Sequence, residues 1–437
     1  MSISMPSIVW DQAIISRYDL SGPRYTSYPT APQFRENFSR DEWLAAVERS
    51  NQSNRNLSLY FHIPFCETLC FYCACNKLVT HHKERAMPYL ERVNQEMMLQ
   101  ASVFTAERPV TQLHWGGGTP TYISEQEMTW LMDRTREHFL RQLGFNRISM
   151  GVQDFNLKVQ EAVNRFNSLQ QVKQLVDVSR ELGYHSISMD LIYGLPRQTR
   201  ETVRESLAKV IDLAPDRLSL FNYAHLPHLF KSQTLIREEW LPGAEEKLVI
   251  LHECIDTLQS AGYVYIGMDH FARPDDSLVR AQHEGSLQRN FQGYSTHGDC
   301  DLIAFGVSAI SHYGGALIQN LKKIDAYQST IDSGKPAFSK GVELTSEDHL
   351  RQYVINQIIC HLTLDYQDLR EKFGIDAPTD FALELAQLVP MEEDGLIEFQ
   401  DQGLRVLNTG RLLVRHICMV FDQYLNSDSQ IRYSKII

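Results

Sequence analysis

The strongest constraint on the fold is a regular alternation of strand-like and helix-like segments between residues 57 and 307. Short apolar or alternating runs, several of them ended by glycine or proline, are followed by longer runs with helical periodicity. This alternation favours a largely parallel sheet with helices outside it, either open or closed into a barrel. The expected strands are 57–63, 111–115, 147–153, 186–196, 216–223, 263–268 and 302–307, and the expected helices are 84–104, one opening at Ser124, 169–182, 199–213 and 244–261.

Three regions depart from the alternation. Residues 1–56 contain GPRYTSYPTAP, whose prolines exclude a long helix, and then a short helix at 41–49 with Asp41 as a candidate N-cap. The polar stretch 271–298 predicts a long loop. After about residue 335, helical segments surround a hairpin-like pair at 395–399 and 404–408. We therefore expect an N-terminal segment (1–56), an α/β domain (57–335) and a small, mostly helical, winged-helix-like domain (336–437).

The charge balance excludes some classes of partner. The chain has 42 Lys and Arg against 54 Asp and Glu, a net charge of −12. Nucleic-acid binding needs clustered positive charge, so we expect no nucleic-acid partner. No apolar run approaches the ~20 residues that a membrane span requires, and the N-terminus lacks a signal-peptide pattern. The expected location is the cytoplasm.

Half of the eight cysteines lie within ten residues. Cys66, Cys70 and Cys73 follow a predicted strand, and Cys75 comes two residues later. Three cysteines can bind three irons of a [4Fe–4S] cluster and leave the fourth iron open. A closed zinc site with Cys75 as fourth ligand is the alternative. The four scattered cysteines are expected to be buried structural thiols.

The spacing Cys-x3-Cys-x2-Cys resembles the signature of the radical S-adenosylmethionine (SAM) superfamily. Further segments are more specific: GPRYTSYPTA, YFHIPFC, HWGGGTPTY, GVQDF, DLIYGLP, FNYAHLP, GMDHFARPDD and QGY. In this order they resemble the oxygen-independent coproporphyrinogen III oxidases, from about Trp10 to the C-terminus. The resemblance implies a partial (β/α) barrel of the radical SAM type.

The resemblance also implies a reaction. SAM bound to the open iron would be cleaved to a 5′-deoxyadenosyl radical, which takes a hydrogen from a propionate side chain. Loss of CO2 and one electron then leaves a vinyl group. The same reaction on two propionate side chains would convert coproporphyrinogen III to protoporphyrinogen IX. The implied cofactors are a [4Fe–4S] cluster and one or two SAM molecules. The implied partners are the substrate and an unidentified one-electron donor, and we expect a monomer.

Site residues carry over from the family motif by motif. Cys66, Cys70 and Cys73 match the cluster ligands, and Cys75 matches an additional cysteine that is not a ligand. Tyr60, Cys75 and Ile310 match positions in the catalytic centre. The positions that match SAM contacts are Tyr60, Tyr72, Gly117, Gly118, Thr119, Gln153, Arg165, Asp190, Ala224 and Ile310. Glycines suit such a site because a backbone without Cβ lets a ligand approach. Asp190 is expected at the C-terminal end of a strand.

A substrate with four carboxylates needs inward-facing cations despite the acidic chain. The N-terminal segment resembles a flap over the family's active site, and the polar stretch carries further candidates. The candidate substrate residues are Arg24, Tyr25, Tyr28, His270, Arg273, Arg289, Phe291 and Gln292.

One departure from the family lies between Phe139 and Leu140, where the family has roughly 25 more residues, most of one βα unit. These residues carry a strand that ends in Glu-Val-Asp-Pro, whose Glu contacts SAM, and no Glu-x-Asp-Pro occurs in this chain. We expect the fold class to survive and the SAM affinity and turnover to be lowered.

Two other functions stay open at this point. A close branch of the superfamily contains tetrapyrrole- or heme-binding chaperones without this activity. Cys75 and GPRYTSYPT favour the enzyme, whereas the missing segment favours loss of catalysis. A zinc-stabilised binding protein is the third alternative, and iron content would distinguish it.

Overall fold

The structure is a computed structural model of the 437-residue chain, and it describes residues 8–18, 20–105, 108–139 and 145–425. The chain folds into two compact units. Unit 1 comprises residues 1–30, 146–296 and 347–437, and unit 2 comprises residues 31–145 and 297–346. These units differ from the three expected parts. The expected N-terminal segment (1–56) and the expected α/β domain (57–335) are each divided between the two units.

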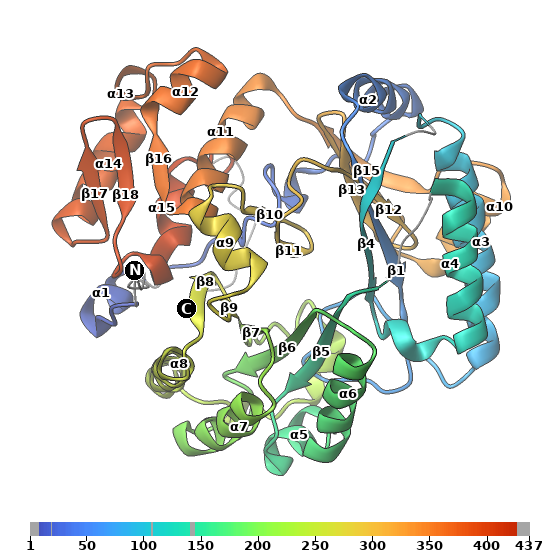
Figure 1. The fold of residues 1–437 in the computed structure, drawn as a ribbon, viewed down its shortest axis with the longest axis horizontal. Helices are drawn as coiled ribbons and strands as arrows, with labels where there is room; N and C mark the ends of the chain where they lie inside the picture. Colours follow the sequence, from blue (N-terminus) through green and yellow to red (C-terminus); the bar gives the residue numbers. More distant parts are fainter. Residues whose placement is uncertain (1–7, 19, 106–107, 140–144, 426–437) are drawn as a thin grey trace. The chain divides into compact units, whose positions relative to one another are not determined.

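Unit 2 is built on a six-stranded sheet of order β15-β14-β13-β12-β1-β4. The central strand β1 pairs in parallel with both neighbours and is almost entirely buried, as a strand covered on both faces should be. Helices α3, α4 and α10 lie along one side of this sheet (Figure 1). The bounds are α2 (Arg40–Ser53), β1 (Leu57–Ile63), β2 (Phe65–Cys66), β3 (Leu78–Val79), α3 (Ala86–Ala101), β4 (Val110–Gly117), α4 (Glu125–Phe139), β12 (Asp301–Phe305), β13 (Ile310–Tyr313), β14 (Ala316–Asn320), α10 (Ile324–Asp332) and β15 (Phe338–Glu343).

Unit 1 contains a five-stranded sheet of order β5-β6-β7-β9-β8, in which β5, β6 and β7 are parallel. Helices α7 and α8 pack against each other beside this sheet (Figure 1). The bounds are β5 (Arg147–Gln153), α5 (Leu157–Val163), α6 (Leu169–Glu181), β6 (Ser186–Tyr193), α7 (Arg200–Asp212), β7 (Arg217–Asn222), α8 (Ala244–Ser260), β8 (Val264–Gly267), β9 (His270–Ala272), α9 (Ser277–His283), β10 (Gln288–Asn290) and β11 (Gly293–Ser295).

The C-terminal part of unit 1 is helical with a small antiparallel sheet of order β16-β18-β17. Its hairpin confirms the expected pair of strands, and β16 adds a third. The N-terminal segment binds here: Tyr18 donates to Asp394 at 2.7 Å and Tyr25 donates to Asp422 at 3.0 Å. The bounds are α1 (Gln12–Arg17), α11 (Ser346–Asn356), β16 (Thr363–Asp365), α12 (Tyr366–Phe373), α13 (Ala377–Asp380), α14 (Ala382–Glu393), β17 (Ile397–Gln400), β18 (Gly403–Val406) and α15 (Val414–Val420).

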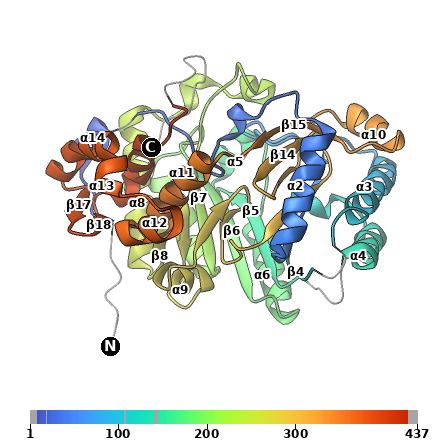
Figure 2. The same ribbon diagram turned by 90° about the horizontal axis from the view of Figure 1, so that it is seen from above.

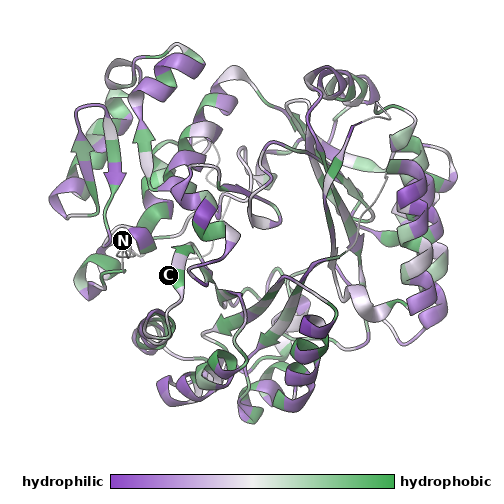
Figure 3. Ribbon diagram, in the orientation of Figure 1, coloured by the Kyte–Doolittle hydropathy of each residue, from purple (hydrophilic) through white to green (hydrophobic). Residues whose placement is uncertain are grey.

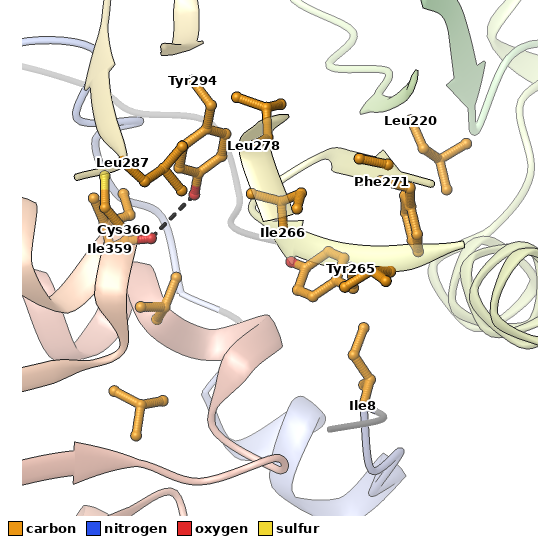
Figure 4. Close-up of a cluster of buried hydrophobic side chains, with 14 of the residues drawn as sticks. Ile8, Leu220, Tyr265, Ile266, Phe271, Leu278, Leu287, Tyr294, Ile359 and Cys360 are labelled. Carbon is orange, nitrogen blue, oxygen red and sulfur yellow. Dashed lines mark hydrogen bonds between the residues drawn. The ribbon is translucent and has the colours of Figure 1, made fainter. Parts of the chain in front are cut away.

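Each unit has its own hydrophobic core. Hydrophobic residues are frequent along the strands, whereas the helices carry many hydrophilic residues (Figure 3). Figure 2 shows α3 and α4 side by side in unit 2. Figure 4 shows part of the unit 1 core, where Phe271 of the β8–β9 hairpin packs beside Tyr265, with ring centroids 5.1 Å apart, and Ile266 lies on the side toward Tyr294. The Tyr294 hydroxyl donates to the Ile359 carbonyl at 3.1 Å, which ties β11 to the C-terminal helices.

Two local predictions were wrong. Helix α2 begins at Arg40 rather than Asp41, because Ser39 is the N-cap: its hydroxyl accepts from Glu42 N while the Glu42 carboxylate accepts from Ser39 N. The stretch 271–298 is not a loop, because it contains α9 and the β10–β11 hairpin. Asp276 begins α9 by accepting from Leu278 N at 2.7 Å, a capping signal that the polar composition hid.

The parallel strands do not close into one barrel. β4 stands at one end of its sheet and β5 at one end of the other, so the described residues hold no strand paired to the outer side of either. The described strands thus agree with the expected partial barrel. The junction 139/140 itself borders residues 140–144, which lie outside the described residues. None of the helices described is long and apolar enough to cross a membrane.

Candidate active site

The cysteine loop is closed at its base by short parallel strands. β1 ends at Ile63, and β2 pairs with β3 so that Cys66 lies opposite Val79. Two backbone bonds complete the closure: Leu78 N donates to Pro64 O at 2.7 Å, and Thr80 N donates to Cys66 O at 2.9 Å. The loop therefore leaves the buried strand β1, carries the cysteines, and closes where β3 pairs with β2.

The protein environment changes the acidity of the thiols unequally. Burial raises the pKa of Cys66. The pKa of Cys73 is lowered to about 6, first by a hydrogen bond from Cys75 and then by the nearby Lys77 ammonium. The thiolate is the form that ligates metal, so Cys73 is prepared for ligation. Among the described residues, no three His, Cys, Asp or Glu side chains surround a single ion position. A [4Fe–4S] cluster does not need one, because each cysteine binds a different iron.

The glycine turn at the end of β4 is packed against the start of the cysteine loop. Gly118 N donates to Ile63 O and Thr119 N donates to Phe65 O, both at 2.8 Å, and Thr119 Oγ1 donates to Cys66 Sγ at 3.6 Å. A Cβ on Gly118 would lie 2.6 Å from Phe65 O. The close approach of the protein's own backbone therefore requires glycine at position 118, whatever ligand the turn also contacts.

Tyr60 lies on β1 beside two histidines. Its hydroxyl is 3.1 Å from His62 Nδ1, and its ring stacks on His114 with centroids 5.5 Å apart. Burial and the Cys75 thiol raise the pKa of Tyr60. Ile310 begins β13, which pairs with β12, the parallel neighbour of β1. Unit 2 thus holds Tyr60, Ile310, the cysteine loop and the glycine turn on adjoining strands.

A second group of predicted SAM contacts lies in unit 1. Gln153 ends β5 with φ +67°, and its Oε1 is buried without a hydrogen-bond partner in the described residues. Arg165 Nη2 donates to Gly151 O at 2.9 Å, and Gly151 pairs with Asp190 of β6. Asp190 accepts from Ser149 Oγ at 3.2 Å, and burial raises its pKa. Asp190 lies inside β6, not at its C-terminal end as expected. Ala224 follows β7, and its carbonyl accepts from Gln233.

Several candidate substrate residues meet in unit 1 with polar atoms left unpaired. Buried atoms without a partner in the described residues include Nδ1 of His270, Nε and Nη1 of Arg289, and both amide atoms of Gln292. The Tyr294 ring links them: its centroid is 5.2 Å from that of His270 and 4.9 Å from the Arg289 guanidinium. Buried donors in native proteins normally have partners, so this group fits an absent anionic ligand.

The other candidates are placed differently. Arg24 Nη1 donates to Asp269 Oδ2 at 2.8 Å, next to His270 in the chain. Arg273 forms an exposed pair with Asp275. Tyr25 and Tyr28 are buried, and their hydroxyls bond to Asp422 and Gln423 N, so they anchor the N-terminal segment to the C-terminal region. Phe291 lies in the turn of the β10–β11 hairpin beside Gln292, and Tyr72 lies between Cys70 and Cys73.

Sequence reasoning missed two polar residues at strand ends. His62 bonds through Nε2 to Asn76 O at 2.9 Å, which ties β1 to the far side of the cysteine loop. Asn222 ends β7, and its Oδ1 is buried without a partner in the described residues. The signal was available, because polar side chains where parallel strands end gather at one edge of a sheet.

Comparisons with known proteins agree with this geometry. The model of the HemN C-terminal domain matches residues 344–413, and that of the radical SAM superfamily matches residues 138–210. The oxygen-independent coproporphyrinogen III oxidase of Pseudomonas aeruginosa is 46% identical over 459 aligned positions, covering 99% of this chain and 100% of the relative. That of Escherichia coli K12 is 45% identical and covers 100% of both.

A solved structure and the alignment lengths add two facts. The E. coli coproporphyrinogen III oxidase (HemN), described as a radical SAM enzyme, matches 96% of this chain and 100% of its own with a TM-score of 0.91 and 45% identity. The P. aeruginosa alignment has 459 positions against 437 residues here, a difference of 22. The P. aeruginosa relative thus carries at least 22 residues that have no counterpart in this chain.

Proposed function

The chain belongs to the oxygen-independent coproporphyrinogen III oxidases, a family of radical SAM oxidoreductases, and from that membership we propose how its own residues perform the reaction. The proposed substrate is coproporphyrinogen III, and the product is protoporphyrinogen IX. The observation that carries the proposal is the cysteine loop, closed by β2–β3 and bonded to the glycine turn, in a chain 46% identical to such an enzyme across its length.

The family implies a [4Fe–4S] cluster and SAM, and the residues fit them. Cys66, Cys70 and Cys73 would hold three irons. Thr119 Oγ1, already bonded to Cys66 Sγ, would steady one ligand, and Cys75 would stay a neighbour of Cys73 rather than a ligand. When bound, the cluster and SAM supply a 5′-deoxyadenosyl radical that removes a propionate hydrogen, after which CO2 and one electron leave and a vinyl group remains.

SAM contacts are proposed for two groups of residues. In unit 2 they are Tyr60, Tyr72, Gly117, Gly118, Thr119 and Ile310, and in unit 1 they are Gln153, Arg165, Asp190 and Ala224. We propose that these residues bind one or two SAM molecules. The unpaired Oε1 of Gln153 supports it, because a buried amide oxygen without a donor suits a ligand's amino group or hydroxyl.

The substrate's carboxylates are proposed to meet the unpaired donors of Arg289 and Gln292, with His270 alongside. Burial lowers the pKa of His270 to about 4, so at neutral pH it is uncharged and binds as a hydrogen-bond donor or acceptor. Arg289 is then the charged group of the cluster. An Arg fork can hold a carboxylate through two parallel hydrogen bonds, which fixes the propionate and excludes water from it.

The test is an anaerobic assay of reconstituted protein with SAM, a reductant and coproporphyrinogen III. We expect CO2 release and protoporphyrin fluorescence after oxidation, at several turnovers. Cys70→Ala should lose iron and activity, whereas Cys300→Ala should keep both, because Cys300 bonds to Thr111 and Asp299, away from the cysteine loop. An intact cluster without product would contradict the proposal and favour the tetrapyrrole-binding alternative.

A further inference from the structure

Helix α3 buries a carboxylate, Glu96, that none of the proposed chemistry uses. The residue is 1% exposed. It accepts three hydrogen bonds: from Gly306 N at 2.8 Å, from Asn320 Nδ2 at 2.6 Å and from the Tyr327 hydroxyl at 2.6 Å. A carboxylate that is buried at this depth is costly unless its oxygens are satisfied, and here donors from three separate elements converge on it.

The donors surround one tight turn, residues 306–309, between β12 and β13. Asn320 Nδ2 also donates to Gly306 O at 2.9 Å, so both polar groups of Gly306 are held. Gly306 has φ +94°, and a Cβ there would lie 2.4 Å from the Tyr89 hydroxyl. Backbone in this region needs glycine and needs surrounding structure to hold it.

A second residue of α3 continues the same network. Tyr89 lies two helical turns before Glu96; its hydroxyl accepts from Val307 N at 3.0 Å and donates to His62 O at 2.6 Å. His62 is next to the end of β1, from which the cysteine loop leaves. One face of α3 therefore fixes the turn and the end of β1 together.

The turn leads directly to Ile310, the first residue of β13. We propose that Glu96 is a positioning residue for SAM binding: its carboxylate fixes the turn 306–309, and through it Ile310, against the end of β1. This rests on the proposed function, which assigns Ile310 to SAM. A neutral amide cannot replace the carboxylate, because an NH2 group would face the donor Asn320 Nδ2 or the donor Gly306 N.

The experiment compares Glu96→Gln with wild type by two readouts. Hydrogen–deuterium exchange of peptides covering 303–312 should become faster in the variant of the cluster-loaded protein. SAM affinity should fall about tenfold, seen as a raised KM for SAM, with kcat at saturating SAM changed less than about twofold. Tyr327→Phe removes one donor and keeps the carboxylate, so it should shift both readouts in the same direction by less.

Asp301→Asn is the matched control. Asp301 is a buried carboxylate on the same strand β12, but at its other end, where Arg108 Nη2 donates to it at 2.6 Å. This variant should lower stability without changing SAM affinity or exchange in the turn. Unchanged SAM affinity in both Glu96→Gln and Tyr327→Phe would overturn the proposal, as would an equal loss in Asp301→Asn. If wild type binds no SAM, the proposed function fails, and unchanged exchange in Glu96→Gln would separately overturn the role of Glu96.

Discussion

At the scale of single residues, the site is defined by backbone contacts more than by side chains. Gly118 bonds to Ile63 O and has no room for a Cβ, so the cysteine loop and the glycine turn fix each other. The sequence predicts both motifs but not their contact, because they are separated by about 50 residues. His62 was missed for the same reason: its partner Asn76 becomes a neighbour only after the loop closes.

Gly118→Ala should therefore destabilise the site. The new Cβ would lie 2.6 Å from Phe65 O and 2.7 Å from Pro64 O, both backbone atoms that cannot move away cheaply. We expect a loss of about 2–3 kcal/mol in the free energy of unfolding, with lower iron retention. Chemical denaturation and iron content measure this. Gly243→Ala is the control, because nothing lies within 4 Å of a Cβ there; equal effects of the two substitutions would refute the packing argument.

Arg289→Gln should weaken substrate binding selectively. Its Nε and Nη1 are buried and unpaired in the described residues, so removing them loses the proposed ion pair with substrate, at the internal cost of the contact between the guanidinium and the Tyr294 ring. We expect the KM for coproporphyrinogen III to rise about 10- to 100-fold, with little change in SAM affinity. Steady-state assays that vary each substrate separately would show it. Arg273→Gln, which removes an exposed pair with Asp275, should leave both constants unchanged.

At the scale of elements, the predictions succeeded where one pattern dominated. β1 and β5 were predicted with their observed bounds, because each ends at a clear signal in the sequence. Pro64 follows β1 and Asp154 follows β5. β13, β14 and β15 were missed, since they are short antiparallel strands, and the turn between β13 and β14 contains no helix of the kind that marks a βα unit. That β4 and β5 each stand at one end of a separate sheet could not be predicted from the sequence, because strand pairing depends on residues far apart in the chain.

Restoring the missing segment tests its cost. A chain carrying the corresponding residues of a relative, inserted between Phe139 and Leu140, should bind SAM more tightly and turn over faster, because β4 and β5 would regain a paired neighbour and the site a Glu. Isothermal titration with SAM and the anaerobic assay measure the gain. A Gly/Ser insert of equal length controls for loop length. No gain over that control would show that the shortened chain is complete in function.

At the scale of the whole molecule, each unit buries a titratable group with a shifted pKa. Acidification changes the stability contributed by these two groups in opposite directions. Unit 1 buries His270 as a neutral ring with its pKa lowered to about 4, where Arg289, Arg217 and Arg24 oppose protonation and Asp269 favours it. Unit 2 buries Glu96, and burial raises its pKa to about 7; Tyr89, Tyr327 and Tyr313 are the titratable groups around it. Other buried groups shift in the same ways: burial raises the pKa of Asp154 and Asp190 in unit 1 and lowers the pKa of His62 and His114 in unit 2.

On acidification from pH 7.5 to pH 5, His270 and Glu96 should contribute oppositely to the stability of their units. Below pH 6.5 the unfolded chain protonates His270 and the folded unit 1 does not, so unit 1 loses stability. Between pH 7 and pH 4.5 folded unit 2 protonates Glu96 and the unfolded chain does not, so unit 2 gains stability. Each complete shift is worth about 3 kcal/mol. Hydrogen exchange of core strands β7 and β1 reports the units separately.

Variants isolate the two groups from the other carboxylates that titrate in this range. His270→Gln should flatten the acid-induced loss at β7 and leave β1 unchanged, because no proton is then taken up preferentially by the unfolded state. Glu96→Gln should remove the gain at β1 and leave β7 unchanged. If hydrogen exchange in β1 and β7 changed together in wild type and in both variants, the two units would unfold as one cooperative body. The effects of protonating His270 and Glu96 would then oppose each other and nearly cancel in the stability of the whole molecule.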